Sequence, residues 1–161
     1  MAAPIATSLS HLFTQLTGCV VTFVQIKDYP NTKIPQVYGA YRTFPGDTVI
    51  VVKADLPLVG SFAGALMGLP DSEVILQLKG TPIGEALRDA MYEVLNIASS
   101  AIAPGRRTVL SKVVNDLATL DEVTSMTLTK PDNKYCFNVS VKGYQGGNFA
   151  VLVQSTPTTA T

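Results

Sequence analysis

Residues 81–105 read TPIGEALRDAMYEVLNIASSAIAPG, and this stretch predicts one long helix. Thr81 is a candidate N-cap, Pro82 suits the first helical position, and Pro104-Gly105 prevents the helix from continuing. Apolar residues recur at intervals of three and four and form one broad face, which we expect to be buried: Ile83, Leu87, Ala90, Val94, Ile97 and Ala101. The rest of the chain is expected to pack around this face.

The opposite side of the predicted helix is polar. It carries Glu85, Asp89, Glu93, Asn96 and Ser100 at the same helical spacing. The three acids lie four residues apart, and like charges at this spacing cost about 0.2–0.5 kcal/mol per pair in an exposed helix. A basic partner would relieve that repulsion. The residues alone therefore leave two interpretations open, a solvated helix face and a binding surface.

The remaining periodicity predicts a mixed chain. Helices are expected at residues 4–16, with Thr7 or Ser8 as cap, and at 55–68, with Asp55 as N-cap. Strands are expected at 19–26, 36–44, 48–53, 122–130, 135–141 and 148–154, the first three as an antiparallel meander. Residues 71–79 fit a strand or, better, a short helix, and 106–120 fit either. The fold class is α+β, an antiparallel sheet with two long central helices.

Composition bounds the remaining properties. The 161 residues are expected to form a single domain, 1–161, with a Thr-rich disordered tail at 155–161. Twelve basic residues balance twelve acidic ones, so we expect no nucleic-acid partner. An apolar content of 47% favours an oligomer, and the absence of a long apolar run predicts a cytoplasmic protein without a membrane partner. Cys19 and Cys136 are expected to be small core residues, and His11 to face solvent.

The run D-x-x-x-E-x-x-N formed by Asp89, Glu93 and Asn96, followed by IASSAI, resembles the signature helix of the CheC, CheX and FliY chemotaxis phosphatases. The segments TVIVVKADLPLVGSFAGALMGLP and LFTQLTGCVVTFV resemble that family's lead-in to the helix and its opening. The resemblance covers roughly residues 8–103 and implies a CheC-like fold.

This resemblance also implies an activity. Family members hydrolyse the aspartyl-phosphate of CheY-like response regulators in two-component signalling. By similarity, Asn96 would hold a water in line with the phosphoryl group, Glu93 would pair with a lysine of the regulator, and Asp89 would support them. Such catalysis is positioning and electrostatics. The chain would need no cofactor of its own, because the Mg²⁺ ion belongs to the phosphorylated receiver domain.

Two departures from the family pattern qualify this expectation. Ala118 stands where the pattern has a proline, and the ExxN motif occurs once. A single motif makes the single-site, dimer-forming CheX-like branch the nearer analogue. The missing proline keeps a second hypothesis open, a non-catalytic adaptor that docks a receiver domain. A third hypothesis is an oligomeric structural protein with Glu93 and Asn96 buried at a subunit contact.

Overall fold

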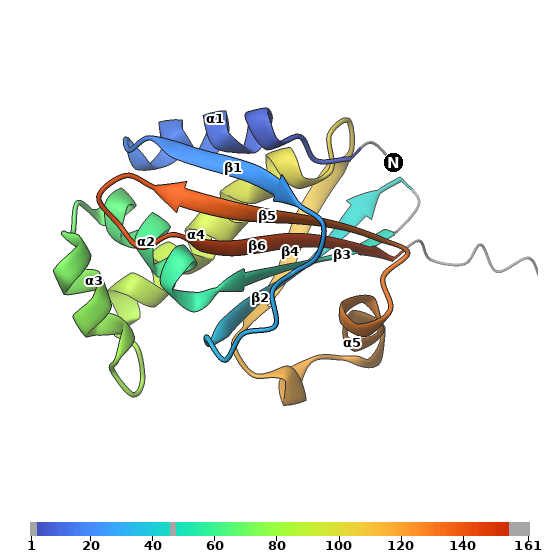
Figure 1. Cartoon of the computed structure of the whole chain (residues 1–161). Helices are drawn as coiled ribbons and strands as arrows, with labels where there is room; N and C mark the ends of the chain where they lie inside the picture. Colours follow the sequence, from blue (N-terminus) through green and yellow to red (C-terminus); the bar gives the residue numbers. More distant parts are fainter. Residues whose placement is uncertain (1–2, 46–47, 155–161) are drawn as a thin grey trace, which may run out of the picture.

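Figure 1 shows the computed structural model, which describes residues 3–45 and 48–154. The strands of its single sheet are β1 Val21–Ile26, β2 Gln36–Phe44, β3 Thr48–Asp55, β4 Arg107–Val114, β5 Asn133–Val141 and β6 Gly147–Gln154. The helices are α1 Ala6–Thr17, α2 Leu56–Met67, α3 Asp71–Leu78, α4 Glu85–Ile102 and α5 Glu122–Thr129, with a 3-10 turn η1 at Leu117–Thr119. This is the predicted α+β class.

All strands of the sheet pair antiparallel in the order β1-β5-β6-β3-β2-β4. Residues 107–114, which the sequence left undecided, form strand β4. The predicted meander of the first three strands is confirmed for the antiparallel pair β2 and β3 but is wrong for β1, which pairs with β5 at the opposite edge of the sheet from β4. Strand periodicity indicates which residues face the core, but it carries no information about which strand is the neighbour.

The sheet has an internal two-fold pattern. If β1, β2 and β3 are exchanged with β4, β5 and β6, the strand order reads the same from the other edge. Each half begins with a helix that leads into an edge strand, α1 into β1 and α4 into β4. The central pair β3 and β6 joins the halves. Helices α1 and α4 therefore occupy equivalent positions, and α2 lies between the halves in the sequence.

The main core lies between one face of the sheet and helices α1, α2 and α4 (Figure 1). Aromatic rings from α1, α2 and three strands meet there: Phe13, Phe23, Phe62, Phe137 and Phe149. Helix α2 packs against α1, α3, α4 and the sheet. A Cβ added at Gly64 would come within 2.1 Å of Val74 on α3, so this glycine is required for the close approach of the two helices.

Two predicted helix starts are wrong. Helix α4 begins at Glu85 rather than at Thr81-Pro82, because Gly84 is extended (φ −54°, ψ 143°) and acts as the N-cap. Glycine is accepted at an N-cap but costs about 1 kcal/mol inside a helix, which favours a start after it. Helix α1 begins at Ala6 with Ile5 at the cap position, so neither Thr7 nor Ser8 caps it. The helix ends agree with the prediction to within one residue for α1, which ends at Thr17 rather than at residue 16, and α4 ends at Ile102, before Pro104 as predicted.

Residues 122–129 form helix α5, so the predicted strand at 122–130 is wrong. Asp121 caps the helix by accepting a hydrogen bond from the Thr124 backbone N–H at 2.7 Å. Thr124 and Thr127 are buried, and Leu128 packs against the second face of the sheet. Their spacing of three and four residues is helical, although alternating threonines favour a strand. Helix α5 thereby covers the sheet face opposite the main core (Figure 1).

Asp55 lies before α2, as predicted, but its side chain does not cap that helix. The carboxylate is buried and accepts hydrogen bonds from Gln36 Nε2 (2.6 Å), the Asn148 backbone N–H (2.8 Å), Asn148 Nδ2 (3.1 Å) and Tyr29 Oη (3.1 Å). Burial and the Asp55 charge raise the pKa of Tyr29 well above its usual range. This network joins the β1–β2 connection to β2, β3 and β6.

The described residues form one sheet with one main core, and none of their helices is both long and apolar enough to cross a membrane. The tail predicted to be disordered, 155–161, lies outside the described residues.

Cys136 is buried, as predicted, whereas Cys19 is half-buried at the edge of the core; both thiols are free. His11 is exposed, as predicted. The single-domain and homodimer expectations stay predictions.

Candidate functional site on helix α4

Helix α4 packs into the protein core through its apolar face. Its buried residues are Leu87, Met91, Val94, Leu95, Ala98 and Ile102, which pack toward α1, α2 and β4. Of the six residues predicted for the buried side, Leu87 and Val94 are buried, whereas Ile83, Ala90, Ile97 and Ala101 are half-buried. The buried face has the predicted spacing of three and four but is centred on the neighbouring positions Met91, Leu95, Ala98 and Ile102. Because successive residues of a helix are about 100° apart, the positions between them must face outward.

The predicted polar stripe lies on that outward side. Glu85, Asp89, Glu93, Asn96 and Ser100 are all exposed. Glu93 and Asn96 are three residues apart, so their Cβ atoms are about 5–6 Å apart on one helix face. One partner surface can therefore touch the carboxylate and the amide together. Residues at a subunit contact are also exposed in a single chain, so the third hypothesis, burial of these two residues at such a contact, stays a prediction.

The stripe has no internal charge compensation. Within the described part of the chain, Asp89, Glu93 and Asn96 make no side-chain hydrogen bond, and neither acid forms an ion pair. The side chains are therefore free to engage another molecule. Three carboxylates along one exposed helix face suit a partner that presents lysine or arginine.

A buried tyrosine braces α4 beside Asn96, and the sequence analysis did not identify it. Tyr41 on β2 is fully buried, and its hydroxyl donates a 2.6 Å hydrogen bond to the carbonyl oxygen of Leu95. Desolvation, with a smaller contribution from Tyr92, raises the pKa of Tyr41 well above its usual range. The phenol therefore stays neutral and remains a donor. This contact fixes the height and rotation of the helix at the residue before Asn96.

Ala118, the departure from the family pattern, lies in η1 after β4 and is exposed. Its backbone N–H donates to Asp116 Oδ1 at 3.0 Å. A proline at this position has no N–H and could not make that bond.

Arg106 and the glycine-rich segment 143–147 have structural roles. The guanidinium of Arg106 donates to the backbone carbonyl of Pro45 at 3.0 Å, and GYQGG forms the turn between β5 and β6. Among the residues that the structure describes, no cluster of three or more histidine, cysteine or acidic side chains could hold a metal ion. The α4 stripe remains the candidate site.

Comparisons with known proteins identify the fold. No protein-family model and no curated protein sequence matches the chain. Among solved structures, the FliM middle domain of Vibrio alginolyticus aligns with a TM-score of 0.61 at 14% identity, covering 93% of this chain and 88% of that one. The FliM middle domain of H. pylori gives 0.58 at 13%, covering 92% and 84%. FliY of Thermotoga maritima gives 0.53 at 16%, covering 92% and 83%.

These similarities extend over nearly the whole described chain, including both halves of the sheet. They confirm the resemblance to the CheC, CheX and FliY family at the level of the fold and do not single out the CheX-like branch. The H. pylori FliM domain has also been solved in complex with FliG, so in that protein the same fold takes part in a protein complex. The chain has the fold of FliY, as the resemblance predicted, and of the FliM middle domain.

Proposed function

We propose that the protein is a chemotaxis-type phosphatase that hydrolyses the aspartyl-phosphate of a CheY-like receiver domain, acting as a cytoplasmic homodimer. The observation that carries this proposal is the pair Glu93 and Asn96, which is exposed on the outer face of a helix whose other face is buried. Together with Asp89, the pair preserves the D-x-x-x-E-x-x-N spacing. The FliM- and FliY-like fold supports the assignment but does not by itself imply activity.

In this mechanism α4 lies across the phosphorylated loop of the receiver. The carboxamide of Asn96 accepts from and donates to a water molecule and holds it in line with the phosphorus. Attack by the water forms the new P–O bond, the bond from phosphorus to the aspartate oxygen breaks, and inorganic phosphate leaves with both protons of the water. The regulator's aspartate is restored as a carboxylate. A Mg²⁺ ion held by the receiver would neutralise the phosphoryl charge.

Glu93 has a docking role in the same scheme. One turn before Asn96, its carboxylate would pair with a lysine of the receiver and fix the approach of the helix. Asp89, a further turn away, would add to the attraction for a basic surface. Bracing of α4 by Tyr41 supports such a mechanism, because in-line attack requires that the amide be held in place.

The test follows phosphate loss from a radiolabelled phospho-receiver in the presence of Mg²⁺. We expect the wild-type chain to accelerate this loss and Asn96→Ala to reduce the acceleration on the order of a hundredfold. Gln15→Ala, an exposed amide on the equivalent helix α1, is the matched control and should keep the activity. The phosphatase proposal fails if the wild-type chain does not exceed the receiver's own decay rate, or if Asn96→Ala and Gln15→Ala behave alike. Light scattering of the same samples tests the dimer.

A second candidate is an adaptor that docks a receiver through the acidic stripe without hydrolysis. Two observations favour it: Ala118 in place of the family proline, and the same fold in FliM bound to FliG. Its signature is salt-sensitive binding that weakens in Glu93→Gln while the phosphate lifetime is unchanged. Binding that is insensitive to salt and to Glu93→Gln contradicts this function.

A further inference from the structure

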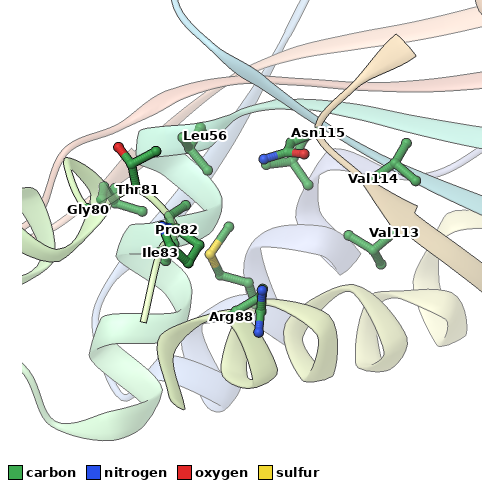
Figure 2. Close-up of a pocket in the computed structure, with 12 residues that line it drawn as sticks. Leu56, Gly80, Thr81, Pro82, Ile83, Arg88, Val113, Val114 and Asn115 are labelled. Atoms are coloured by element: carbon green, nitrogen blue, oxygen red, sulfur yellow. The ribbon is translucent and has the colours of Figure 1, made fainter. Parts of the chain in front are cut away.

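A hollow of about 380 Å³ opens beside the first turns of α4, on a different side of the helix from the acidic stripe. Figure 2 shows its residues converging from the loop before α4, from α4 itself, from the start of α2 and from the end of β4. Its volume lies within the range of small-molecule pockets in proteins. The twelve lining residues include neither Glu93 nor Asn96.

The wall of this hollow is mainly hydrocarbon. The lining contains Val37, Leu56, Leu78, Pro82, Ile83, Met91, Val113 and Val114. Val37 and Met91 are 3% and 5% exposed and belong to the main core. Binding of a hydrocarbon group to such a surface is favourable, because it removes apolar surface from water.

One positive charge stands at the rim. Arg88 is exposed and lines the hollow, and it is the single charged residue among the described lining residues. It has no ion-pair partner within the described chain. Asn115 and Thr81, also exposed at the rim, add an amide and a hydroxyl. A guanidinium binds a carboxylate through two parallel hydrogen bonds, and the lining offers no acid to compete for it.

We propose that this hollow binds a small carboxylic acid with a hydrocarbon chain. The carboxylate pairs with Arg88 at the rim, and the hydrocarbon lies against Met91, Val37 and Val113. The apolar wall and the single unpaired cation favour this class over a cationic or a purely polar ligand. The ligand site is separate from the proposed phosphatase surface and does not depend on it.

The experiment titrates the full chain with octanoate by isothermal calorimetry, with no receiver present. We expect saturable one-to-one binding to octanoate, about tenfold weaker binding of octan-1-ol, and no saturable binding of octylamine. Hexanoate should bind about fifteenfold more weakly than octanoate, because two methylene groups are no longer buried. These ligand comparisons use the wild-type chain and do not depend on the folding of any variant.

Two variants locate the site. Arg88→Gln should lower octanoate affinity about tenfold and abolish the preference for octanoate over octan-1-ol. Arg107→Gln, an exposed arginine at the start of β4, is the matched control and should bind octanoate as the wild type does. Any of three results overturns the proposal: no saturable octanoate binding, equal affinity for octanoate and octan-1-ol, or an equal effect of Arg88→Gln and Arg107→Gln.

Discussion

Replacement of Asp55 by serine distinguishes the two roles that this residue could have. Serine is as good an N-cap as aspartate, so a role in capping α2 would leave Asp55→Ser close to the wild-type stability. In the structure, however, the carboxylate binds Gln36, Asn148 and Tyr29 and does not cap the helix. The shorter serine side chain cannot reach these three groups together. We therefore expect a substantial loss of stability.

The size of the loss follows from the donors left without a partner. Asp55 is 2% exposed, so water does not readily replace its carboxylate. The amide of Gln36 and the backbone N–H of Asn148, at 2.6 and 2.8 Å, lose their acceptor. An unsatisfied buried donor costs about 1–3 kcal/mol. Two such donors predict a decrease of about 2–6 kcal/mol in the free energy of unfolding.

Urea unfolding followed by far-UV circular dichroism measures this decrease, read as a lower midpoint at unchanged slope. Asp28→Ser is the control, because Asp28 is an exposed carboxylate whose 2.6 Å ion pair with Lys134 lies in solvent, and its loss should be much smaller. If Asp55→Ser costs less than about 1 kcal/mol, or no more than Asp28→Ser, then the network does not stabilise the fold as argued.

Three further predictions concern other buried or capping groups. Tyr41→Phe removes the hydroxyl bonded to the Leu95 carbonyl and should lower the free energy of unfolding by about 1 kcal/mol, measured in urea; an unchanged midpoint contradicts the brace on α4. Asp121→Ala should cost about 0.5–2 kcal/mol at neutral pH, because the α5 cap is lost. The hydrogen bonds to Thr124 lower the pKa of Asp121 in the folded state. The stabilisation by this cap is therefore present above the unfolded pKa of about 3.9 and is lost as the pH falls through the lower folded pKa. If the free energies of unfolding of Asp121→Ala and the wild type still differ below pH 2, the ionised carboxylate is not the source of the stabilisation. Burial raises the pKa of the Cys136 thiol, so mass spectrometry should find it alkylated only along the urea unfolding transition, and rapid labelling of the native protein would contradict its burial.

Much of the fold could be predicted from local patterns. Strands β2, β3, β5 and β6, helix α2 and the ends of α1 and α4 follow periodicity and glycine or proline signals that act over a few residues. The prediction failed where two local signals competed. In 122–129 the β-branched residues favoured a strand, while the cap at Asp121 and the apolar face of the sheet favoured a helix. Tertiary packing decided between them.

The candidate site likewise has features that the local sequence determined and features that only the tertiary structure decided. The sequence by itself determined that Asp89, Glu93 and Asn96 share one side of a helix, because a period of 3.6 residues places them there. Only the tertiary structure decided that this side faces outward, since exposure depends on what α1, α2 and β4 leave uncovered. The pairing of β1 with β5, the brace from Tyr41 and the hollow beside Arg88 join residues distant in the chain. No local propensity encodes such contacts, because they exist only after the halves of the sheet have come together.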